Sequence, residues 1–147
     1  MDEFVKLLDG NLDYVSHELL DDVFYITVKS NRTKVICPFC GFASSKTHSV
    51  YLRSFQDLPL QGKKVILLLQ NRKMFCLNHD CKHITFAERF DFMSHKAKKT
   101  RRLEDEIILL SLNCSSTAAA ELLKKNYVDV GKSTICNLLK KRKNNNR

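Results

Sequence analysis

The sequence predicts an α+β protein in which a small β-rich unit is followed by three short helices. Alternating apolar and polar residues, rich in Val, Ile, Phe and Tyr, fill much of residues 1–90, which is the pattern of half-buried strands. From residue 103 onward, apolar residues instead recur every three or four positions, as on one side of an amphipathic helix. The chain has 147 residues, of which 44% are hydrophobic and 28% charged, so it is long enough for one ordinary domain or two small ones.

Composition excludes several other classes of protein. The chain contains only 4 glycines and 2 prolines, so we expect disorder only at its ends. No apolar run approaches the roughly 18 residues that a membrane-spanning helix requires. The N-terminus lacks the basic start and apolar core of a signal peptide. We therefore expect a cytoplasmic protein without a membrane partner.

The first 36 residues predict a short helix and three strands. Residues 2–9 place their apolar side chains on one side of a helix, and partial alternation predicts strands over 12–19 and 23–29. A polar turn at 30–33 then leads to a strand over 34–36. That strand runs directly into the first of two cysteine pairs.

Four of the six cysteines have the spacing of metal ligands. Two residues separate Cys37 from Cys40, four separate Cys76 from Cys81, and 35 residues lie between the pairs. Two thiolates on one tight turn can point at a common centre, and Gly41 lets the backbone tighten behind the second one. Because the cytoplasm keeps thiols reduced, the pattern favours a structural Zn²⁺ site over disulfides. The alternative is a set of buried, reduced cysteines.

The other metal-binding side chains leave two questions open. His79 and His83 flank Cys81, so one of these imidazoles in place of a thiolate is an alternative fourth ligand. Cys114 and Cys136 have no partner at ligand spacing, and we expect them to be small buried hydrophobes. A closed four-ligand site has no open position for a reacting water, so we expect a structural role and no catalytic residue.

The segment between the cysteine pairs predicts a zinc-ribbon-like β unit. Strands are expected over 49–55, 63–69 and 72–75, connected by turns at 59–62 and 70–71. So small a unit buries little apolar surface. Zinc binding, worth about 10–16 kcal/mol in structural zinc peptides, is therefore expected to decide whether it folds.

Three helices are expected after residue 102. Leu103 and Ile107 begin the apolar side of the first helix, and residues 115–117 offer an N-cap for the second. Gly131 allows a turn before a third helix that begins near Lys132. Small alanines would let the middle helix pack closely on the third, so the order of elements predicts a helix-turn-helix. The alternative is an ordinary helical hairpin with one solvated side.

These patterns divide the chain into four segments. We expect an N-terminal β-rich zinc-binding domain at 1–90, a basic linker or helix start at 91–102, a helix-turn-helix at 103–142 and a disordered tail at 143–147.

Charge is distributed unevenly along the chain. Residues 1–36 have a net charge of −3, whereas residues 37–147 have a net charge of +12. Such localised basic charge favours a polyanionic partner, double-stranded DNA first, because phosphates release counterions on binding. The alternative is a surplus of charge that serves solubility. The candidate DNA-binding residues are Lys98, Lys99, Arg101, Arg102, Lys132, Ser133, Thr134, Asn137, Lys140, Lys141 and Arg142.

Four polar residues of the β-rich unit have two interpretations each. Arg53 and Asp57 share one side of a strand, so they could form an ion pair or contact a phosphate. Arg72 and Lys73 lie beside the second cysteine pair and could contact a phosphate or simply be exposed.

Several short motifs follow one another in a fixed order within residues 20–142. They are CPFCG at 37–41, HSVYLR at 48–53, DLPLQG at 57–62, the apolar run 65–69, NRKMFC at 71–76, Cys81, and FAER at 86–89. In these motifs and in the helices that follow them, the chain resembles the N-terminal region of bacterial insertion-sequence transposases of the family often called ISL-three. The resemblance implies that the zinc region and the helix-turn-helix bind the terminal inverted repeats of the element, while a separate RNase-H-like domain with a DDE carboxylate triad cuts and joins the DNA. It also allows a homodimer, because two element ends have to be paired.

The chain ends soon after the third helix, which leaves no room for that catalytic domain. We therefore expect a non-catalytic, DNA-binding module with a structural zinc and no small-molecule substrate. Two alternatives are a standalone transcriptional regulator derived from a transposase and a protein-binding zinc ribbon. An enzyme with metal-activated water would need an open ligand position and a neighbouring acid or base, and the sequence shows neither.

Overall fold

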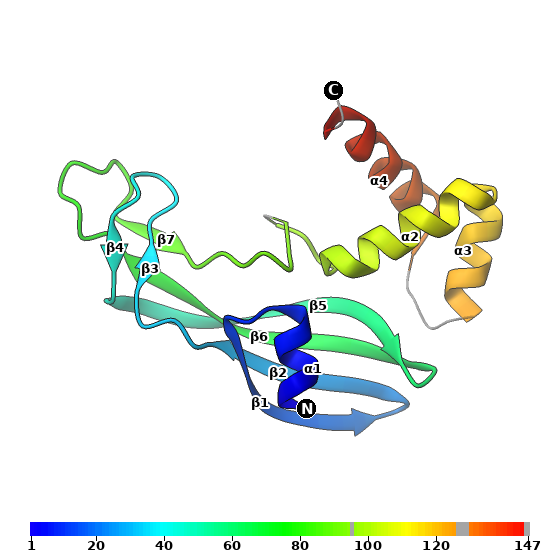
Figure 1. Cartoon of the computed structure of the whole chain (residues 1–147), viewed down its shortest axis with the longest axis horizontal. Coiled ribbons are helices and arrows are strands. Elements are labelled where there is room, and N and C mark those ends of the chain that lie inside the picture. Colours follow the sequence, from blue (N-terminus) through cyan, green and yellow to red (C-terminus); the bar gives the residue numbers. More distant parts are fainter. Residues whose placement is uncertain (95, 126–129, 146–147) are drawn as a thin grey trace.

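A computed structural model describes all residues except 95, 126–129 and 146–147. The described residues form four helices and seven strands, which confirms the α+β class (Figure 1). None of these helices is long and apolar enough to cross a membrane. The elements, in chain order, are α1 (Asp2–Leu8), β1 (Leu12–Leu20), β2 (Val23–Ser30), β3 (Val35–Ile36), β4 (Ala43–Ser44), β5 (Thr47–Leu60), β6 (Lys63–Phe75), β7 (Thr85–Ala87), α2 (Arg101–Asn113), α3 (Ser116–Lys125) and α4 (Lys132–Asn145).

The main sheet has the strand order β1-β2-β6-β5, and β7 pairs with the C-terminal end of β6, at residues 73–75. Neighbouring strands are antiparallel except β2 and β6, which run parallel. A tight turn with positive φ at Gln61 and Gly62 connects β5 to β6. The short strands β3 and β4 form a separate two-stranded sheet.

The two long strands differ from the prediction, which placed a break at residues 70–71. β6 instead runs without interruption through Asn71, which is fully buried and pairs with Tyr51 of β5. The Asn71 amide donates a hydrogen bond of 2.8 Å to the Tyr51 hydroxyl. A buried amide with a cross-strand partner does not interrupt a strand, although the same residue in a sequence suggests a turn.

The sheet has an apolar core of its own. Ile26, Phe55 and Leu67 are fully buried on one side of the sheet, where Val5 of α1 and Phe92 pack against them. The main sheet therefore buries more apolar surface than the sequence predicted for the β-rich unit. The prediction underestimated the burial because the contributions of α1 and of the chain after β7 are not local in sequence.

A buried carboxylate ties the segment after β7 to the sheet. Glu88 is 1% exposed, and its Oε1 lies 3.0 Å from Nε of Arg72. Ser30 donates a hydrogen bond of 2.6 Å to the same carboxylate, and Arg32 lies 3.6 Å from it. Arg72 is thus occupied by a structural ion pair within the protein.

Helices α2, α3 and α4 pack around a second apolar core. Leu103 and Ile107 of α2, Ala119 of α3 and Ile135 of α4 are at most 1% exposed. The small side chain of Ala119 allows close packing of α3, as the sequence suggested. The last helix extends through Asn145, so residues 143–145, expected in a disordered tail, are helical; the end of that predicted tail lies outside the described residues.

The helices are joined to the sheet through Asp57 of β5. Thr100 caps α2, and its hydroxyl donates a hydrogen bond of 2.8 Å to the Asp57 carboxylate. Arg102 donates two hydrogen bonds to the same carboxylate, and the one from its Nε is 2.7 Å long. The suggested ion pair between Arg53 and Asp57 is therefore wrong. Arg53 instead lies over the Phe55 ring and donates to the Ala97 carbonyl.

Candidate metal centre and nucleic-acid interface

The first cysteine pair lies on a tight turn between β3 and β4. The Cys37 carbonyl accepts a hydrogen bond of 2.9 Å from the Gly41 N–H, and the Cys37 N–H donates to the Phe42 carbonyl at 2.9 Å. Gly41 has a φ of +77°, a conformation that side chains resist, which explains why glycine follows Cys40. The sequence therefore folds this segment so that both thiols face the same side of the turn.

The second cysteine pair follows β6 at the same end of the sheet. The Cys76 N–H donates to the Ile84 carbonyl at 2.8 Å, and the Cys81 N–H donates to the Asn78 carbonyl at 3.1 Å. The Asn78 side chain accepts a further hydrogen bond from the Asp80 N–H at 3.0 Å. These bonds close a loop with four residues between the thiols, so the wider spacing still brings both sulfurs to one place.

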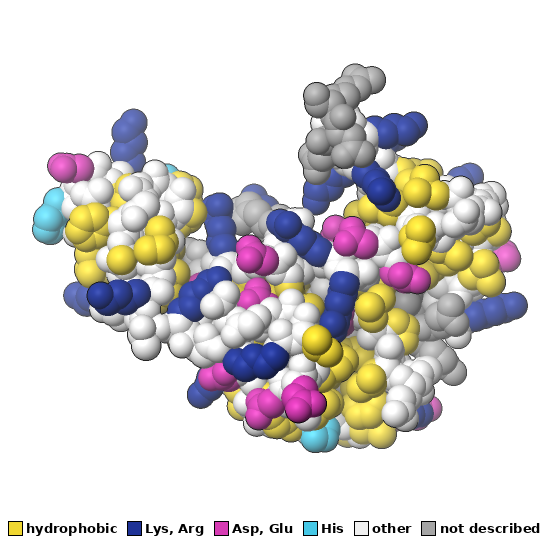
Figure 2. Space-filling view, in the orientation of Figure 1, with side chains coloured by type: hydrophobic (Ala, Val, Ile, Leu, Met, Phe, Trp, Pro, Cys, Tyr) yellow, Lys and Arg dark blue, Asp and Glu magenta, His cyan; other side chains and the backbone are white. Residues whose placement is uncertain are grey.

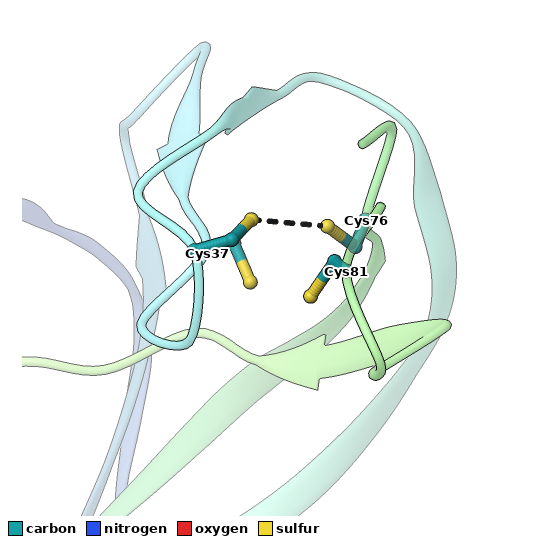
Figure 3. Close-up of side chains that lie close together, drawn as sticks. Cys37, Cys76 and Cys81 are labelled. Atoms are coloured by element: carbon teal, nitrogen blue, oxygen red, sulfur yellow. Dashed lines mark hydrogen bonds between the residues drawn. The ribbon is translucent and has the colours of Figure 1, made fainter. Parts of the chain in front are cut away.

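The two turns bring all four thiols together. Their sulfur atoms lie within 4.8 Å of one another, and Cys40 and Cys76 are 3.6 Å apart. Figure 3 shows the labelled cysteines pointing toward a common centre from two separate loops. Tetrahedral Zn²⁺ with Zn–S bonds of about 2.3 Å sets its ligands about 3.8 Å apart, so this donor set fits the metal. Cys37 is 1% exposed and belongs to the same buried cluster as Val35, so apolar packing fixes the position of this ligand.

The thiols influence one another's ionisation. A hydrogen bond from the Phe42 N–H lowers the pKa of Cys40 to about 7, because it favours the thiolate. The Asn78 N–H has the same effect on Cys76, but burial and the neighbouring Cys40 and Cys37 outweigh it and raise the pKa of Cys76 to about 12. Four adjacent thiolates need a cation to balance their charge, and Zn²⁺ supplies it.

The structure answers the question of the fourth ligand. Among the described residues, the candidate metal-binding group consists of the four cysteines and includes neither His79 nor His83. The His83 ring stacks on Phe39, with ring centroids 3.6 Å apart. Cys114 and Cys136 lie outside the cluster and are partly buried in the helical unit, where Cys114 donates to the Leu110 carbonyl. The cluster is thus a closed, four-thiolate structural site.

This site and its two β turns define a class of protein module, the zinc ribbon. Residues 33–81 match the family model described as the zinc-finger of transposase IS204/IS1001/IS1096/IS1165. No curated protein matches the chain, and no solved structure does. The match confirms the resemblance to insertion-sequence transposases for the ribbon segment and, with the cysteine geometry, establishes the structural zinc.

The predicted DNA-binding residues of α4 lie mostly on its solvent side. Thr134 is half-buried, and the others are exposed. Asn137 and Lys141 are one turn apart and therefore lie on the same side of the helix. The exposed residues are Lys132, Ser133, Asn137, Lys140, Lys141 and Arg142.

The predicted residues around the start of α2, which begins at Arg101, differ in their exposure and contacts. Lys98 and Arg101 are exposed, and Lys99 is half-buried. Arg102 is bonded to Asp57, so its guanidinium holds α2 against the sheet and is not available to a phosphate. The role of Asp57 was missed because its partners, Thr100 and Arg102, are more than forty residues away. The one local signal was Thr100, a favourable N-cap residue directly before a helix.

Proposed function

We propose that this chain is the DNA-binding, non-catalytic part of an insertion-sequence transposase and that it recognises the terminal inverted repeats of its element. The observation that carries the proposal is a transposase-type zinc ribbon in one chain with a helix that exposes polar and basic side chains. The net charge of +9 favours a polyanionic partner. The closed thiolate site supports a structural role, since it leaves no position for an activated water.

The reading element in this proposal is a helix-turn-helix formed by α3 and α4. Ala119 of α3 is fully buried in the same cluster as Ile135 of α4, which allows the close packing that this motif requires. The opposite side of α4 presents Ser133 and Asn137 near its N-terminus and basic residues further along. Short polar side chains suit base edges, and Lys140 and Lys141 suit the flanking phosphates.

The rest of the chain has supporting roles in this proposal. Residues 1–90 form the zinc-binding domain, and the basic residues Lys98, Lys99 and Arg101 add phosphate contacts near the start of α2. Arg102 acts as a positioning residue through Asp57. In this proposal, two copies of the chain pair the two ends of the element. Because the element is part of the bacterial DNA, the bound protein is associated with the nucleoid.

The test uses a duplex that the zinc-loaded chain enriches from a random pool, compared with a scrambled duplex of equal length. We expect affinity to fall with salt at a slope of about −0.9 per phosphate contact. Asn137→Ala should relax discrimination by about 1–3 kcal/mol at one base position, whereas Lys140→Ala should weaken both duplexes similarly. Asn113→Ala, at the exposed end of α2, is the matched control and should change neither value. Equal wild-type affinity for both duplexes contradicts sequence-specific recognition.

A second candidate function is protein binding by the ribbon. Apolar side chains are exposed there, including Ile36, Phe39 and Ile84, which are 58%, 50% and 78% exposed. Such a patch is typical of a protein contact. A zinc-loaded chain with no measurable affinity for any duplex would favour this function over DNA recognition.

A further inference from the structure

Three adjoining clefts run from the zinc ribbon to α4, and we call them together the basic groove. The cleft at the ribbon is lined by Arg32, Lys34 and Arg89, and no carboxylate is among its described lining residues. Arg89 also lines the middle cleft, of about 620 Å³, which continues to Ser94 and Arg101. Each cleft shares lining residues with the next, so the three clefts adjoin one another between the ribbon and the helices.

The far end of the basic groove is formed by the helical unit. Ser94 and Arg101 also line a third cleft, of about 730 Å³, together with Lys141 and Arg142 of α4. Asn137 lies one turn before Lys141 on the same side of α4. The groove thus ends at the helix surface that the proposed function assigns to base reading. Figure 2 shows the hollow between the ribbon and the helices, with Lys and Arg side chains along it.

The charge of the basic groove is predominantly positive. Its described lining residues include eight cationic side chains and four carboxylates. One of the carboxylates, Glu88, is already paired with Arg72, which lies outside the groove. By contrast, Lys34 and Arg89 are exposed, and the Arg89 guanidinium lies over the Phe39 ring, 5.6 Å from its centroid. A concave path of exposed cations matches the backbone of a nucleic acid better than an acidic peptide, because a backbone presents phosphates at regular intervals.

We infer that the basic groove holds the phosphate backbone of the same DNA duplex that α4 reads, so that Lys34 and Arg89 of the ribbon end contact phosphates beyond the site of the helix-turn-helix. The inference rests on the proposed function and extends it. It assigns the DNA contacts of the ribbon end to two exposed side chains, Lys34 and Arg89. It also predicts that the DNA site is longer than a single recognition helix requires.

The experiment measures the salt dependence of binding for the full zinc-loaded chain on two duplexes. Both duplexes contain the selected sequence. The short duplex is limited to the base pairs that the proposed function assigns to α4, and the long duplex extends beyond them. For the double variant Lys34→Ala/Arg89→Ala, the salt slope on the long duplex should fall by about 0.9 per lost contact, hence by about 1.8. On the short duplex, the variant and the wild type should have the same slope. Arg89→Lys should retain the wild-type slope, since it keeps the charge.

The matched control is Lys29→Ala/Lys63→Ala, which removes the same charge from β2 and β6 outside the lining of the three clefts. This control should leave the slope within about 0.5 of the wild type. Zinc content equal to wild type shows that the ribbon of each variant is intact. If the groove variant keeps the wild-type slope on the long duplex while Lys140→Ala loses affinity, the inference is overturned and the proposed function stands. If the wild type binds neither duplex, both fail.

Discussion

The zinc ribbon and the helical unit α2–α4 lie at opposite ends of one sheet and are stabilised in different ways (Figure 1). The ribbon has two strands of two residues each, and few buried apolar side chains surround its four thiols. The helical unit instead buries a continuous set of Leu, Ile and Ala side chains. A short segment rich in turns therefore needs a metal to hold it together, whereas three short helices need only complementary apolar sides.

The largest expected effect comes from removing one zinc ligand. Cys37→Ser should prevent tight zinc binding and unfold the ribbon, because about 10–16 kcal/mol of metal binding energy is coupled to its folding. Helices α2–α4 should remain folded. Zinc stoichiometry and far-UV circular dichroism measure the two effects.

Cys114→Ser is the matched control for this change. Cys114 lies in the helical unit, away from the metal cluster, so this variant should bind one zinc per chain. A Cys37→Ser protein that keeps full zinc content would show that the four thiols do not hold the metal together.

The second effect should be confined to the helices. Ile135→Ala removes a fully buried side chain and should destabilise the helical unit by about 2–5 kcal/mol through the lost burial and the cavity left behind. Thermal unfolding followed at a helix-sensitive wavelength measures the loss, and zinc stoichiometry should not change. Leu109→Ala, at a position 56% exposed, should change stability by less than about 0.5 kcal/mol. Loss of zinc in Ile135→Ala would contradict the separation of the two regions.

The smallest effect should appear at the junction between helices and sheet. Thr100→Ala removes the N-cap of α2 and its hydrogen bond to Asp57, which should cost about 1–2 kcal/mol. Thr100→Ser keeps the hydroxyl and should restore most of the loss. Thr117→Ala, at an exposed position of α3, should be close to neutral. Chemical denaturation measures these differences, and a neutral Thr100→Ala would exclude the cap as the link between the two regions.

The metal site was predictable from the sequence because its information is local. The pairs Cys37/Cys40 and Cys76/Cys81 each form within a single turn, and Gly41 supplies the backbone freedom that the first turn uses. The starts of the last two helices, at Ser116 and Lys132, are also close to the predicted caps, since capping depends on a few adjacent residues.

The sheet and the junction were not predictable in the same way. The parallel pairing of β2 with β6 joins segments about forty residues apart, and no periodicity within either strand specifies it. The expected ion-pair partner of Asp57 was Arg53, but its actual partner is Arg102. Alternation along a strand identifies which residues share a side, but it does not identify the element that packs against that side. Distant contacts of this kind depend on the whole fold.

The most direct test of the account is hydrogen exchange of the chain, resolved by segment, with bound zinc and after treatment with a chelator. We predict that the chelator abolishes protection in the ribbon segments 35–44 and 76–85, while α2, α3 and the central residues of β6 keep most of theirs. Equal protection with and without chelator, or a uniform loss across ribbon and helices, would contradict the claim that zinc organises the ribbon alone.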